Sequence, residues 1–180
     1  NVGAYDGKGY GESIGSMIHH QGLEIPSEKE LEGRITELIR EDPREAAAAA
    51  DLLWAVRQFE LSPGWLEIPH PWQQSSAQGE AFRLGVPFTG HPMFGHDIIY
   101  NHPMNHGASL GRCAQRDFLT FAESISRLDG GVYISIGSAI MSPMIFEKSL
   151  SMAQNVALQK GAQISEHTMV VVDLAESDWD

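Results

Sequence analysis

The first regular pattern of apolar and polar residues predicts a helical hairpin over residues 27–60. Ser27 and Glu30 have the spacing of a capping box, and apolar residues then recur at helical intervals. Asp42 followed by Pro43 marks a second helix start, because proline suits the first turn of a helix, and an alanine run continues that helix. We expect the two helices to pack against each other.

The segments that flank the hairpin lack its helical pattern of apolar residues. Residues 1–5 have the pattern of a strand end, and the glycine-rich residues 6–15 are typical of a loop that opens a short helix. Residues 61–72 are rich in proline, so they can form neither a regular helix nor a central strand. We expect this last stretch to cross a face of the molecule.

Beyond residue 72 helices alternate with short apolar strands. The helices are predicted over residues 73–84, 106–128 and 143–160, and the strands over residues 86–91, 132–136 and 168–174. This alternation is typical of a parallel sheet that helices cover on both faces. We therefore predict an α/β protein with a Rossmann-like three-layer fold and a mostly parallel sheet, formed by a βα core over residues 73–175 and preceded by the helical hairpin.

The length of 180 residues suits a single α/β domain over residues 1–180. The chain opens at Asn1 rather than at a methionine, in a segment predicted to end a strand. We therefore expect a fragment of a longer chain, with trimming or processing as the alternatives.

The composition of the chain limits the partners that it is expected to bind. The formal net charge of −12 disfavours nucleic acid and anionic membranes, which bind largely through lysine and arginine, and suits a small cationic substrate. We expect neither a bilayer-spanning segment nor a signal peptide. The single cysteine, Cys113, lies among helix-like apolar positions and is expected to be buried. Because no disulfide framework is possible, we expect a reducing compartment and a cytoplasmic protein.

Ligands of open parallel sheets bind beyond the carboxyl ends of the strands. Three loops meet that description, namely residues 90–97, residues 137–142 and the loop that begins at Asp173. We expect all three to face one crevice, which would form the ligand site.

The first of these loops and its continuation are rich in histidine. His91, His96, His102 and His106 follow one another closely, with Asp97 among them. A neutral histidine beside an aspartate can serve as a general base, so His91, His96 and Asp97 are the candidate catalytic residues. The cluster also permits a metal site, although it lacks the tight spacing of a helical zinc motif.

Two glycine-containing turns are candidate anion sites. Gly137 and Ser138 precede a predicted helix, so their N–H groups could hold a phosphate or a carboxylate, although a glycine there can also serve packing alone. Gly7, Gly9 and Gly11 precede another helix, but their spacing departs from the dinucleotide pattern GxGxxG.

The stretch QSSAQGEAFRLGVPFTGH, from Gln74 to His91, and the stretch SISRLDGGVYISIGSAI, from Ser124 to Ile140, resemble the deoxyhypusine synthase family. The resemblance covers about residues 74–160. It implies a Rossmann-like fold, a homo-oligomer (dimer or tetramer), and NAD bound near Ser75, Ser76, Gly137, Ser138 and Asp173. That family transfers the aminobutyl group of spermidine through an imine on a lysine. Lys148 does not occupy the place of that lysine, which favours a relative that uses the same scaffold.

Three functions remain open at this point. The first is an enzyme that binds NAD and a small polar or polyamine-like substrate, with a transferase-like reaction. The second is a metal-dependent hydrolase or lyase that uses the cluster from His91 to His106. The third is a non-catalytic binding or scaffold subunit.

Overall fold

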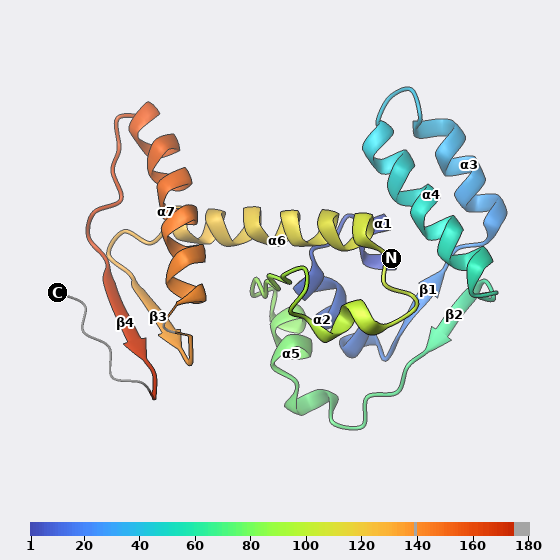
Figure 1. The fold of residues 1–180 in the computed structure, drawn as a ribbon, viewed down its shortest axis with the longest axis horizontal. Coiled ribbons are helices and arrows are strands. Elements are labelled where there is room, and N and C mark those ends of the chain that lie inside the picture. The colour runs from blue at the N-terminus through green and yellow to red at the C-terminus, as the bar shows by residue number, and fades with distance from the viewer. Residues whose placement is uncertain (139, 175–180) are drawn as a thin grey trace. The chain divides into compact units, whose positions relative to one another are not determined.

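The computed structural model describes residues 1–138 and 140–174. The chain divides into two compact units, which we call unit 1 (Asn1–Asp117) and unit 2 (from Phe118 onward). Helix α6 (Gly107–Ser126) contributes its first half to unit 1 and its second half to unit 2 (Figure 1). No helix among the described residues combines the length and the apolar character needed to cross a membrane.

Unit 1 is mainly helical. Before α6 its elements are α1 (Val2–Tyr5), α2 (Tyr10–His20), β1 (Gly22–Ile25), α3 (Glu28–Leu38), α4 (Pro43–Gln58), β2 (Gly64–Glu67), the 3-10 helix η1 (Gln73–Ser75), α5 (Ala77–Leu84) and the 3-10 helix η2 (Ile98–Asn101). Residues 1–5, predicted to end a strand, instead form the short helix α1, so that expectation was wrong.

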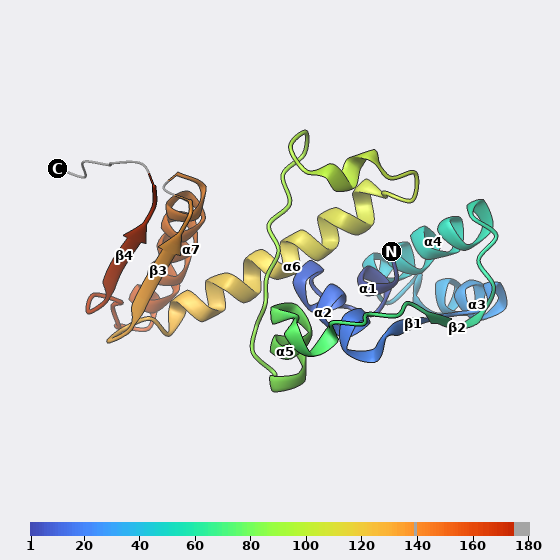
Figure 2. The ribbon, with the colours of Figure 1, turned by 90° about the horizontal axis from the view of Figure 1, so that it is seen from below.

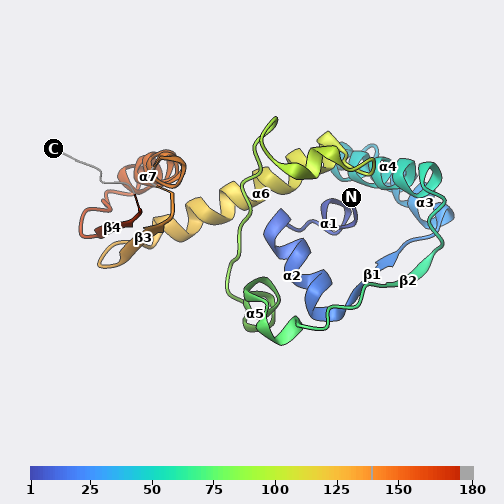
Figure 3. The ribbon, with the colours of Figure 1, turned by 60° about the horizontal axis from the view of Figure 1, so that its bottom comes forward.

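The helical hairpin is confirmed as the pair α3 and α4, which lie side by side in Figures 1 and 3. Ser27 and Glu30 form the predicted capping box, and the Asp42 carboxylate accepts the backbone N–H of Arg44 at 3.1 Å. The helices bury one apolar cluster against β1, made of Ile25, Leu31, Ala49, Leu52, Leu53 and Val56. Burial of these side chains supplies the main stabilisation of this part of unit 1.

A two-stranded antiparallel sheet joins β1 to β2, with Gly22 opposite Glu67 and Ile25 opposite Gly64. Strand β2 falls inside the proline-rich segment, and it has only one partner strand among the described residues. Prolines on either side of such a short edge strand remove no bond of the ladder, which reconciles the composition with the strand.

Helices α2 and α5 pack closely, as Figures 2 and 3 show. A Cβ atom on Gly15 would lie 2.6 Å from the Gln78 carbonyl oxygen, so only glycine allows this approach. The imidazole of His19 contacts the ring of Phe82 across the same interface, with centroids 5.5 Å apart.

Unit 2 contains β3 (Val132–Ile136), α7 (Met141–Gln159) and β4 (Thr168–Val172). The two strands are parallel, with Val132 opposite Thr168, and they confirm the last two predicted strands in position. The ring of Tyr133 stacks on Phe146 of α7 at 4.3 Å, so α7 covers one face of this sheet. On the other face Val132, Ile134 and Ile136 are exposed.

The predicted Rossmann-like three-layer fold with a mostly parallel sheet is wrong. The described residues form two separate sheets of two strands each, one antiparallel and one parallel. The predicted strand over residues 86–91 is an irregular segment. The N–H of Gly90 donates to the Asp117 side chain at 2.7 Å, Pro87 has no N–H to donate, and Val86 is more than half exposed.

Candidate functional site

The candidate catalytic residues lie between α5 and α6 in unit 1. The His91 Nε2 atom lies 3.0 Å from the hydroxyl of Thr89, and burial lowers the pKa of this imidazole while the charge of Asp117 opposes the shift. The Asp97 carboxylate accepts the N–H of Met93 and closes a local turn. The side chain of His96 is exposed. The observed contacts of Asp97 therefore hold the loop together.

The candidate cofactor residues are divided between the two units. Ser75 is exposed in η1, and the Ser76 hydroxyl accepts the N–H of Gly79 at 3.1 Å, which makes it the N-cap of α5. These contacts assign Ser76 to the helix start.

In unit 2, Gly137 and Asp173 follow the ends of the paired strands β3 and β4, as expected for parallel neighbours. The N–H of Gly137 donates to Val172 at 2.8 Å. The Ser138 hydroxyl accepts the N–H of Ser142 at 3.1 Å, so one donor at the start of α7 already has a partner. Because residues 86–91 belong to neither sheet, the expectation that three strand ends share one edge fails for His91.

The histidine cluster has local partners. The His102 Nδ1 atom accepts the N–H of Met104 at 3.1 Å. Within residues 1–138 and 140–174, no three His, Cys, Asp or Glu side chains are grouped so that they could hold a metal ion.

The glycines of the Gly7-Gly9-Gly11 loop serve close packing. A Cβ on Gly9 would lie 1.8 Å from an Asp117 carboxylate oxygen, and a Cβ on Gly11 would lie 2.1 Å from the Phe88 carbonyl oxygen. Neither position can accept a side chain without movement of its neighbours, which explains these two glycines without a dinucleotide.

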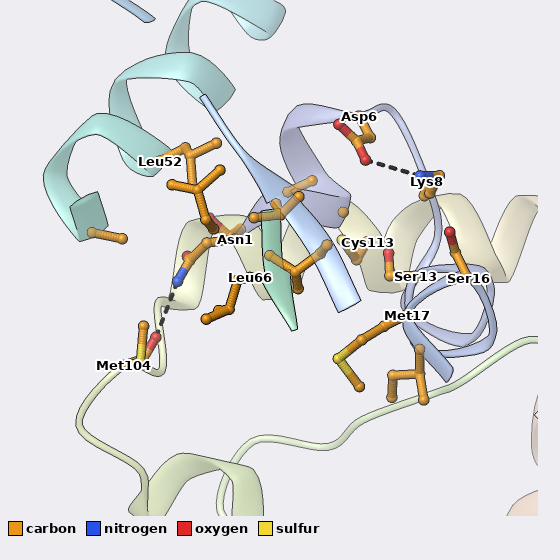
Figure 4. A pocket seen from close by; sticks show the side chains of 18 of the residues that line it. Asn1, Asp6, Lys8, Ser13, Ser16, Met17, Leu52, Leu66, Met104 and Cys113 are labelled. Atoms are coloured by element: carbon orange, nitrogen blue, oxygen red, sulfur yellow. Dashed lines mark hydrogen bonds and ion pairs between the residues drawn. The ribbon is translucent and has the colours of Figure 1, made fainter. Parts of the chain in front are cut away.

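The sequence did not reveal a cavity of about 920 Å³ in unit 1. This volume falls within the roughly 300–1,000 Å³ of small-molecule sites. Its walls are mostly apolar and come from α1, α2, β1, α4, β2, η2 and α6; Figure 4 shows Met17, Leu52 and Leu66 among them. These residues are scattered along the chain, so no local pattern marks them as one site.

The polar groups of the cavity include the side chain of Asn1. Its Nδ2 donates to the Met104 carbonyl at 3.2 Å, as the dashed line in Figure 4 marks, whereas its Oδ1 is buried and has no hydrogen-bond partner among the described residues. The thiol of Cys113, which is buried as expected, also lines the cavity, and burial raises its pKa. The wall is therefore mostly apolar, but it also includes polar side chains, among them Ser13 and Ser16, that a ligand could contact.

His106 and Ser109, at the start of α6, also line the cavity. The His106 Nδ1 atom lies 3.2 Å from the Ser109 hydroxyl, and its Nε2 atom lies 3.9 Å from the Asp51 carboxylate. The centroids of the His106 and Trp54 rings lie 5.0 Å apart. From the sequence, His106 is expected only as a possible metal ligand; its spacing of three residues from Ser109 is the local signal that could have indicated this contact.

Comparison of this chain with protein-family models, with curated proteins and with solved structures finds no match.

Proposed function

We propose that unit 1 binds a small ligand with an apolar body and a hydrogen-bond donor in the cavity between α2, α4, β2 and α6. The observation that carries this proposal is the mostly apolar lining of the cavity together with the few polar side chains in its wall, among them Ser13 and Ser16. Transfer of an apolar group from water into such a site contributes about 25 cal/mol per Å². A donor on the ligand could also bond to a hydroxyl oxygen of Ser13 or Ser16.

Binding of NAD and of a polyamine-like substrate remains a second proposal, which rests on the family resemblance. The parallel β3–α7–β4 arrangement, with Gly137 after the first strand, favours it. One observation opposes this second proposal. The Ser138 hydroxyl accepts the N–H of Ser142 at the start of α7, so that donor is already used within the protein. NAD and spermidine are therefore tested beside the apolar ligands.

The experiment measures the melting temperature and the binding heat with four probes, namely 1-octanol, octanoate, NAD and spermidine. Octanol is expected to raise the melting temperature because it supplies both an apolar chain and a donor. Leu66→Trp narrows the cavity and is expected to abolish the octanol shift. Leu84→Trp is the matched control, since Leu84 is exposed in α5 and does not line the cavity.

The absence of any shift with octanol and octanoate would contradict the proposal, as would an equal shift in the Leu66→Trp protein. A shift with NAD alone that survives Leu66→Trp would favour the second proposal instead.

A further inference from the structure

We propose that Ser109, His106 and Asp51 form a nucleophile, base and carboxylate that hydrolyse carboxylic esters whose apolar acyl groups occupy the unit 1 cavity. This inference rests on the proposed ligand binding and adds a reaction to it. A serine within reach of a base that a third group faces is the arrangement that activates hydroxyl nucleophiles.

The hydrogen bonds around His106 fix which ring nitrogen acts as the base. The backbone N–H of Ser109 points at His106 Nδ1 at 3.4 Å, and the Ser109 hydroxyl lies 3.2 Å from the same atom. Because an N–H points at it, Nδ1 is the unprotonated nitrogen, and the ring proton belongs to Nε2. The nitrogen nearest the Ser109 hydroxyl is therefore the one that can accept its proton.

Asp51 faces the opposite side of the imidazole. Its Oδ1 atom lies 3.9 Å from His106 Nε2, and its Oδ2 atom forms an ion pair with Arg112. The side chains of His106 and Asp51 are 24% and 20% exposed, so water screens their attraction only in part. The carboxylate would stabilise the imidazolium that forms when His106 takes the proton.

The reaction needs only the ester and water. The Ser109 Oγ atom attacks the carbonyl carbon and its proton passes to His106 Nδ1; the bond from that carbon to the alcohol oxygen then breaks, and the same proton leaves with the alcohol. A water molecule next attacks the acyl carbon and gives a proton to Nδ1, and the acid is released as Ser109 regains that proton. The N–H of Ser109 points at His106 Nδ1 and the N–H of Leu110 donates to the His106 carbonyl at 2.9 Å, so the first-turn N–H groups left for the ester carbonyl oxygen are those of Gly107 and Ala108.

The same contact between Ser109 and His106 also resembles a helix cap, and the choice of variants separates the two roles. Asparagine is a good N-cap residue, so His106→Asn preserves the cap while it removes the base. If the contact only caps α6, this variant keeps both its stability and any esterase activity. If His106 is the base, the variant keeps its stability and loses activity.

The test measures hydrolysis of p-nitrophenyl butyrate and p-nitrophenyl octanoate by the full chain. We expect faster hydrolysis of the octanoate ester, because its chain fills more of the cavity. Ser109→Ala and His106→Asn are each expected to lower kcat/KM by about 100-fold or more. Ser124→Ala changes a half-buried serine farther along the same helix, outside the cavity; it is the control and should retain the activity.

A second measurement does not depend on whether the variants fold. An alkyl fluorophosphonate should add one phosphonyl group to the unaltered protein, and peptide mass analysis should place it on Ser109. No adduct there, or equal hydrolysis by the unaltered and Ser109→Ala proteins, would overturn the inference. If octanol still raises the melting temperature in that case, the binding proposal stands while the catalytic one fails.

Discussion

The buried carboxylate of Asp117 accepts the backbone N–H of Gly11 at 2.8 Å, although 106 residues separate the two in the chain. The same oxygen, Oδ2, accepts the N–H of Gly90 at 2.7 Å. Asp117 thus joins α6 to the start of α2 and to the irregular segment before His91. Because Asp117 is only 2% exposed, these charge-assisted bonds form out of contact with most of the solvent.

Substitution of Gly11 by alanine should destabilise unit 1. The added Cβ would meet the Phe88 carbonyl oxygen at 2.1 Å, and relief of that clash must move backbone. We expect a loss of about 1–3 kcal/mol in the free energy of unfolding, measured by urea denaturation. Gly33→Ala is the control, because nothing lies within 4 Å of its Cβ, and it should stabilise α3 by about 0.5–1 kcal/mol. Equal effects of the two changes would refute this explanation of Gly11.

His91 should make stability fall in weak acid. Burial lowers the pKa of the folded imidazole below 6.5, so the unfolded chain binds a proton that the folded chain resists. The stability that the neutral His91 imidazole contributes is fully present above the unfolded pKa. It is lost as the pH falls through the lower, folded pKa. Between about pH 8 and pH 5 the free energy of unfolding of His91→Gln should fall less steeply than that of the unaltered protein. Parallel curves would contradict the prediction.

Asp129 should make the stability of unit 2 fall in acid. Its Oδ1 accepts the N–H groups of Glu166 at 2.8 Å and Ser165 at 2.9 Å, and these bonds lower its pKa below 3.8. The stabilisation is therefore present above the unfolded pKa and disappears as the pH falls through the lower folded pKa. NMR titration of the carboxyl carbon measures the shift directly. A titration at the ordinary aspartate pKa would count against these two bonds in solution.

Cys113 should react slowly with thiol reagents in the folded protein. Burial raises the pKa of its thiol above 9.0, so little thiolate is present at neutral pH. The rate with Ellman's reagent should rise sharply in concentrated urea, and octanol should slow it further because Cys113 lines the cavity. Cys113→Ser should show no reaction, since the chain has a single cysteine. Fast, complete reaction of the folded protein would show that the thiol is accessible.

The features that the sequence predicted correctly depend on neighbours in the chain. Ser27 with Glu30, and Asp42 with Pro43, specify helix starts within one turn, and the hairpin follows from them. Residues 86–91 show the opposite case. Their apolar run has the composition of a strand, but a strand also requires a partner, and here the side chain of Asp117 takes the N–H of Gly90.

The cavity could not be predicted for a related reason. Met17, Leu52 and Leu66 have ordinary apolar positions in three separate elements, and only the folded chain brings them to one space. The prediction of His91 and Asp97 as catalytic residues depended on a strand over residues 86–91, and these residues join neither sheet. His106 and Ser109 are three residues apart, but their relation to Asp51 required the packing of α4 beside α6.

The exposed face of the β3–β4 sheet affects how this protein must be handled. Val132, Ile134 and Ile136 are each more than half exposed on consecutive outward positions of β3. A water-facing aliphatic row beside open strand edges lowers solubility, so preparations at high concentration should precipitate first through this surface. Ile134→Lys should keep such preparations clear, because a charge placed in the middle of the row interrupts it.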